Sequence, residues 1–152
     1  MLRRILVLAA AALVLAPTAS AAGLTRSEGS ILREMNRVRA AHGLKALRFD
    51  PRLERAARFH SQEMLGTDTF EHGAFGTRMS TFSVRGSFAG ENLAWGVGSR
   101  ATARGIVAGW LASPLHRANL LRPGFRRVGV GALVGSFSGY DAATVVTADF
   151  AG

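Results

Sequence analysis

One histidine stands where a helix is expected to begin. The stretch SPLHRANLL, residues 113–121, opens with Ser113 and Pro114, a pair typical of the N-cap and first position of a helix. His116 would then be the third helical residue, where unpaired backbone N–H groups and the helix dipole disfavour an imidazolium. A neutral imidazole is the form that binds a metal ion. The position predicts a metal ligand, or alternatively a histidine that only hydrogen-bonds at a helix end.

The composition excludes several other chemistries. The 152 residues include no cysteine, so thiol catalysis and disulfides are ruled out. There is no GxSxG stretch and no Ser, His and Asp arrangement that would indicate a serine nucleophile. The formal net charge is +9, but no basic stripe interleaved with aromatic residues occurs, so we expect no nucleic-acid partner.

The first residues have the form of a secretory signal peptide. Arg3 and Arg4 precede an apolar run over residues 5–16 and the small residues 19–21. A membrane anchor is the alternative, but the run is shorter than the roughly 20 residues that span a bilayer. We predict a signal peptide (1–21), a short N-terminal segment (22–30) and one domain (31–152). The mature protein would be extracellular or periplasmic, without a transmembrane segment.

Four helices and a hairpin are expected to position the candidate functional residues. Apolar periodicity and capping residues predict helices over 27–42, 51–66, 101–111 and 114–121. Strand character over 127–134 and 142–150, joined by the turn-rich GSFSGYD, predicts an antiparallel hairpin. Residues 66–100 are rich in glycine and predict a long ordered loop region with one short strand at 92–95.

Five stretches in a fixed order resemble the CAP superfamily, which includes cysteine-rich secretory, antigen 5 and pathogenesis-related proteins and bacterial secreted SCP-like domains. They are the segment from ILREMNRVRA to RFHSQEM, FEHG, GENLAWG, WLASPLHRANLLRPGFRRVGVG and TADF. The resemblance covers about residues 31–150. It implies an α+β fold, a three-layer α-β-α sandwich with a small antiparallel sheet, for the domain over 31–152.

The resemblance also implies a cleft lined by two histidines and acidic residues, which in several members holds zinc or another divalent ion. The matching positions are His72 in FEHG, Glu91 in GEN and His116. A further glutamate of eukaryotic members falls on Ser113, so one carboxylate is missing, as is common in bacterial members. His72, His116 and Glu91 are thus the expected metal ligands, with one position left for water. No organic cofactor is expected.

Each candidate also has a purely structural interpretation. His72 could be a surface loop residue, and Glu91 could bond the loop backbone or pair with an arginine. Asn92 is interpreted as an organiser of the loop through side-chain to backbone bonds.

Four further residues are expected to be structural. Trp95 and Trp110 are predicted core residues. His60 shares an apolar helical face and is predicted to be a buried, hydrogen-bonded residue, whereas His42 ends the first helix.

Three functions are consistent with these residues. The first is a secreted, monomeric binding module with a metal-capable cleft that receives a peptide, a lipid or an envelope glycan. The second is a metal-dependent, peptidase-like hydrolase using a zinc-activated water, with Glu91 or Glu71 as the catalytic carboxylate. The third is a cationic structural protein of the cell envelope. One carboxylate cannot easily be both ligand and base, and Glu71 would have to face the cleft, so the residues favour binding over catalysis.

Overall fold

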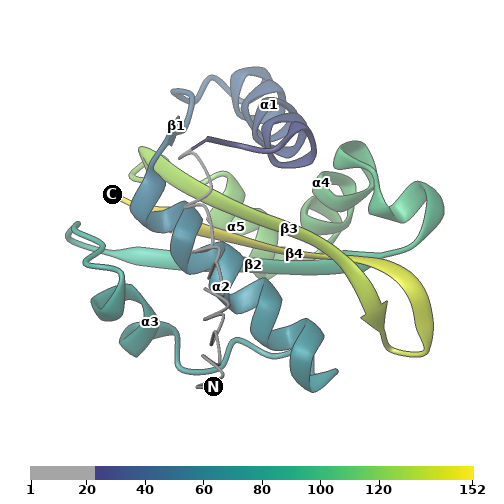
Figure 1. Ribbon diagram of the computed structural model, residues 1–152. Coiled ribbons are helices and arrows are strands. Elements are labelled where there is room, and N and C mark those ends of the chain that lie inside the picture. Colours follow the sequence, from purple (N-terminus) through teal and green to yellow (C-terminus); the bar gives the residue numbers. More distant parts are fainter. Residues whose placement is uncertain (1–22) are drawn as a thin grey trace, which may run out of the picture.

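A four-stranded sheet lies between two layers of helices in the computed structural model, which describes residues 23–152 (Figure 1). The strands are β1 (Arg48–Phe49), β2 (Ala89–Gly96), β3 (Arg127–Phe137) and β4 (Tyr140–Ala151), in the order β1-β3-β4-β2. β4 pairs antiparallel with β2 and β3, and β1 pairs parallel with β3. The predicted α+β sandwich is confirmed, and the predicted signal peptide lies outside the described residues.

Helices cover both faces of the sheet. One layer holds α1 (Arg26–Ala41), α4 (Ala103–Ala112) and α5 (Pro114–Leu120), and the other holds α2 (Pro51–Thr67) and α3 (Phe75–Thr81) (Figure 1). A short 3-10 helix, η1, spans Gly98–Ala101. The Asp50 side chain accepts from the backbone N–H groups of Arg52 and Leu53, which fixes the start of α2. No helix within residues 23–152 has the length and apolar character needed to cross a membrane.

The sequence VGVG explains how closely α2 approaches the sheet. Val128 and Val130 point into the core formed with α1 and α4, while Gly129 and Gly131 face α2. A Cβ atom at Gly129 would lie 1.9 Å from the backbone nitrogen of Glu54. Glycine is required here because the helix backbone itself occupies the space of a side chain.

The loop prediction for residues 66–100 is wrong in two places. This stretch contains α3, and its strand β2 runs over eight residues instead of four. α3 has only seven residues, and Ala74 at its N-cap position makes no side-chain cap. The sequence therefore contained neither a periodic pattern nor a capping residue that would indicate this helix. The hairpin turn is also tighter than predicted, because only Ser138 and Gly139, both with positive φ, connect β3 to β4.

Candidate functional site

His72 and Glu91 form a hydrogen-bonded pair at the edge strand β2. His72 Nδ1 lies 2.7 Å from Glu91 Oε1. The His72 side chain is 59% exposed and the Glu91 side chain only 3%. An ionised carboxylate can only accept, so in the neutral ring Nδ1 carries the hydrogen and Nε2 keeps a lone pair. The pair therefore presents an oriented imidazole at the protein surface.

Arg78, from α3, bonds the other oxygen of the same carboxylate. Its Nη2 donates to Glu91 Oε2, and both side chains are almost completely buried. The Arg78 Nη1 group also donates to the backbone carbonyl of His72, at 3.4 Å. Arg78 thus ties α3, the His72 loop and β2 together, and it was not among the residues predicted from the sequence.

A second buried carboxyl group stands beside Glu91. Asp149 is the register partner of Glu91 in β4, it is fully buried, and within residues 23–152 its two oxygens have no hydrogen-bond partner. Burial raises the pKa of Asp149 well above its usual range, and the charge of Glu91 raises this pKa further, against the opposing effect of Arg78. Burial therefore favours the protonated form of Asp149.

His60 is a buried histidine that lies next to Glu91. It is 3% exposed and its Nε2 lies 2.8 Å from the carbonyl oxygen of Glu71, as predicted for a buried, hydrogen-bonded histidine. The same Nε2 is 3.9 Å from Glu91 Oε2, so His60 lies nearer the site than the sequence indicated.

His116 comes from the opposite helical layer. The side chain of Asn92 donates to the carbonyl oxygen of His116 at 2.9 Å, and Asn119 donates to Asn92 Oδ1 at 3.1 Å and to the Glu91 carbonyl at 3.0 Å. These amide contacts fasten α5 to β2. Asn92 lies in a strand, as predicted, and its predicted side-chain to backbone bonding is confirmed, although the acceptor lies in α5.

The pKa of His116 is lowered, in the direction predicted but for a different reason. Burial is the main cause, and the neighbouring charge of His72 adds to it. The predicted cause was the start of the helix. Ser113 does occupy the N-cap position of α5, but its side chain makes no capping bond. Partial withdrawal from water beside a second imidazole therefore favours the neutral form of His116.

Both histidines line one open cleft across the β2 edge of the sheet. The cleft has a volume of about 380 Å³. It is bounded by His72, Phe75, Gly90, Glu91, Ser113, Leu115, His116 and Asn119. The cleft joins the two helical layers, since His72 approaches from the α3 side and His116 from α5.

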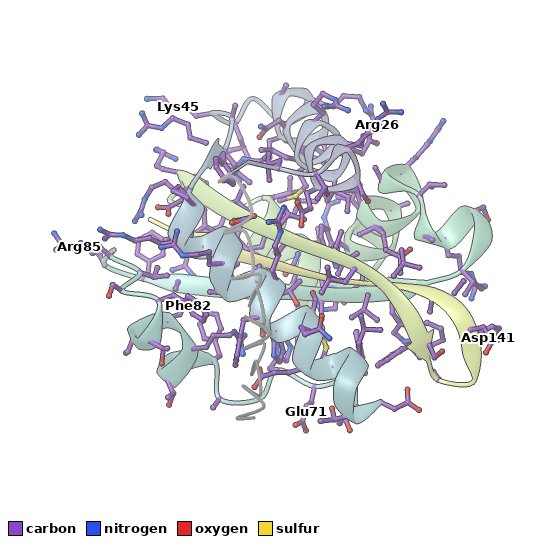
Figure 2. The ribbon with its side chains drawn as sticks, in the orientation of Figure 1. Arg26, Lys45, Glu71, Phe82, Arg85 and Asp141 are labelled. Atoms are coloured by element: carbon purple, nitrogen blue, oxygen red, sulfur yellow. The ribbon has the colours of Figure 1, made fainter. Side chains whose placement is uncertain are left out.

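Glu71, the other candidate carboxylate, lies elsewhere. It lines a second cavity of about 410 Å³ between α2 and α3, and the cleft that contains His72 and His116 is lined without it. Figure 2 shows Glu71 at the lower rim of the molecule, and Phe82 lines the same second cavity. Glu71 and His72 are adjacent in the same loop, but Glu71 lines the second cavity whereas His72 lines the cleft.

Of the two tryptophans predicted to be core residues, only Trp110 is fully buried. Trp110 is 1% exposed and its Nε1 donates to the carbonyl oxygen of Leu93 at 2.8 Å. Trp95 is half-buried and packs against Phe137 and Tyr140. His42 Nδ1 lies 2.9 Å from the carbonyl oxygen of Val38 at the end of α1, away from the site.

The fold is that of an SCP-like domain, as comparison with known proteins shows. Residues 32–150 match the CAP, or cysteine-rich secretory protein, family, so this chain belongs to that family, although it contains no cysteine.

Bacterial proteins are among its relatives. YkwD of Bacillus subtilis is 33% identical over 119 residues, which are 75% of this chain and 45% of that protein. An extracellular protein with an SCP domain from Bacillus anthracis is 31% identical, with a TM-score of 0.66 over 82% of this chain and 40% of the other. An outer surface protein of Borrelia burgdorferi is 24% identical, covers 78% of this chain and 88% of its own, and shares the fold with a TM-score of 0.64. This chain spans less than half of each of the two Bacillus proteins.

Proposed function

We propose that this chain is an extracellular binding module that holds a divalent metal ion between His72 and His116. The observation that carries the proposal is the 2.7 Å bond between His72 Nδ1 and Glu91, which leaves Nε2 of an oriented ring at the mouth of the cleft. A carboxylate that orients a metal-binding histidine in this way is common at metal sites. The extracellular location rests on the predicted signal peptide and on the descriptions of its relatives.

The two histidines fit a metal ion better than the full set of three predicted ligands does. Both oxygens of Glu91 are already engaged, one by His72 and one by Arg78. Within residues 23–152 no three His, Cys, Asp or Glu side chains are grouped so that they could hold an ion. We therefore assign Glu91 the role of orienting His72, and leave His72 Nε2 and a ring nitrogen of His116 as ligands.

An ion held by two histidines retains open coordination positions, which a ligand with oxygen donors could fill. Leu115, which is 81% exposed, and the half-buried Phe75 line the same cleft and offer apolar contacts. This combination suits a peptide, a lipid or an envelope glycan that presents an oxygen donor next to an apolar group.

The geometry supports binding better than hydrolysis. A hydrolase needs a carboxylate that is free to accept a proton from water. Glu91 is engaged on both oxygens, Glu71 lines the other cavity, and Asp149 is fully buried. Within the described part of the chain, no carboxylate is therefore placed to act as a base in the cleft.

Calorimetric titration of zinc into the metal-stripped protein tests the proposal. The protein should bind one zinc ion, and the His72→Ala/His116→Ala variant should lose this binding. The matched control is His42→Ala, which removes a histidine at the end of α1 and should leave binding unchanged. Binding that the double variant keeps, or no binding to the unmodified protein, would refute the metal site.

A further inference from the structure

The positive charge of the described chain is concentrated at one end of the molecule. Residues 43–55, 83–88 and 122–127 carry eight basic and two acidic residues, whereas the rest of residues 23–152 carry nine basic and eight acidic ones. Nearly all the excess positive charge therefore belongs to these three stretches. We call them the basic end.

The three stretches meet in space although they are far apart in sequence. The backbone N–H of Arg48 donates to the carbonyl of Arg126 at 2.9 Å, and Arg52 Nη1 donates to the carbonyl of Ser83 at 3.2 Å. Arg127 also donates to the carbonyl of Arg85. In Figure 2, Lys45 and Arg85 lie at one end of the molecule and Asp141 at the other.

Most of this charge is uncompensated. Asp50 pairs with Arg127 at 2.6 Å, and the buried Glu54 pairs with Arg58, so both acidic residues are already engaged. Among residues 23–152, no ion pair involves the exposed basic residues of this end, which are Lys45, Arg48, Arg52, Arg55, Arg85, Arg122 and Arg126. Arginine predominates, and its planar guanidinium group suits the oxygens of phosphate.

We propose that the basic end binds an extended polymer that carries phosphate groups. The cations are spread over three stretches instead of converging on one pocket, so a chain of anions fits them better than a single small anion. This surface is distinct from the histidine cleft, and the proposal does not depend on the proposed function.

Two other kinds of partner fit the basic end less well. The large exposed apolar side chains, Phe59, Phe70, Leu115, Val134 and Tyr140, all lie outside these stretches, so the surface lacks an apolar anchor for a lipid bilayer. Its aromatic residues are Phe49 and Phe88, which are half-buried, and the fully buried Phe125, against which Phe88 packs. Nucleic-acid bases would therefore find no exposed aromatic surface on which to stack.

The test measures binding of long-chain inorganic polyphosphate to two variants of equal net charge. The basic-end variant replaces Lys45, Arg48, Arg55 and Arg85 by glutamine. The control variant replaces Arg26, Arg33, Arg100 and Arg104 by glutamine, which are also exposed and form no ion pair within the described residues. Thermal unfolding of both variants verifies that they fold, and the pairs Lys45→Gln/Arg48→Gln and Arg55→Gln/Arg85→Gln serve as milder versions.

The basic-end variant should bind polyphosphate at least about tenfold more weakly and with a smaller dependence on salt, because fewer phosphates are neutralised. The control variant should bind as the unmodified protein does. Equal losses in the two variants would overturn the proposal, since binding would then follow net charge alone. Stronger binding to single-stranded DNA at equal phosphate concentration, or to vesicles containing phosphatidylglycerol, would overturn it in favour of a nucleic acid or a membrane surface.

Discussion

His72 Nδ1 and Glu91 Oε1 lie 2.7 Å apart, and the second oxygen of Glu91 is bonded by the buried Arg78. One carboxylate therefore orients an exposed imidazole and neutralises a buried guanidinium at the same time. Arg78 and Asp149 form the buried part of the site, and His72 forms its exposed part.

Replacing Glu91 by glutamine should destabilise the fold strongly. The Glu91→Gln change leaves the Arg78 charge buried without a counter-charge, and such a loss costs about 3 kcal/mol. Urea unfolding measures the change. Glu34→Gln, which breaks the exposed pair with Arg37, is the matched control and should have no measurable effect. Equal stabilities of the two variants would contradict the account of Arg78.

Asp149 should make stability fall as the pH rises. Its pKa is raised in the folded protein by burial and by Glu91, whereas the unfolded chain releases the proton near pH 3.8. The folded state then binds more protons above that pH, so the contribution is complete below it and is lost as the pH rises towards the folded pKa. Asp149→Asn removes this dependence. Urea unfolding of both proteins at pH 4 and pH 8 should therefore show the variant gaining stability relative to the unmodified protein at the higher pH; a constant difference would be inconsistent with a buried neutral acid.

The pKa of His116 should respond to His72. Burial and, secondly, the charge of His72 lower this pKa below its ordinary value of 6.5. His72→Ala removes only the second cause, so NMR titration of the His116 ring should show a pKa that rises but stays below 6.5. No rise, or a rise above the ordinary value, would mean that the two rings are not neighbours in the cleft or that His116 is not desolvated.

The lowered pKa of His116 also implies a dependence of stability on pH. Below pH 6.5 the unfolded chain takes up a proton that the folded chain resists, so the free energy of unfolding should fall as the pH drops through the window between 6.5 and the folded pKa. His116→Gln should reduce the fall in this window. Urea unfolding at pH 7 and pH 5 measures it, and an unchanged fall in the variant would contradict the assignment.

Gly129→Ala should cost about 2 kcal/mol or more, because a Cβ atom would lie 1.9 Å from the backbone of α2. The control is Gly66→Ala near the end of the same helix, where nothing lies within 4 Å of the added atom. It should stabilise the protein by about 0.5–1 kcal/mol through helix propensity. Thermal unfolding distinguishes the two, and a tolerated Gly129→Ala would show that α2 can move away from the sheet.

The elements that could be predicted from the sequence are those with a local signal, namely capping residues or apolar periodicity. Asp50 and Pro51 marked the start of α2, and apolar periodicity marked α1, α4 and the hairpin. β1 has two residues and α3 seven, which is too short for a periodic signal. Both are fixed by tertiary contacts, as when Arg48 bonds the backbone of Arg126 in the last turn before β3.

The site was predicted in its outer part only. His72 and Glu91 came from the family resemblance, and His116 also from its place at the start of a helix. Arg78 and Asp149 depend on where α3 packs and on the register of β2 with β4. Asp149 did leave a signal, because an acidic residue in an otherwise buried strand is rare and usually has a partner.

In the proposed site, Glu91 orients His72 and does not itself bind the metal ion. A crystal structure of the zinc-loaded protein, with anomalous scattering measured at the zinc edge, tests this arrangement. We predict one zinc peak at about 2.0–2.1 Å from ring nitrogens of His72 and His116, with Glu91 still bonded to Nδ1 of His72. A peak within bonding distance of a Glu91 oxygen, or no peak between the two histidines, would contradict the account.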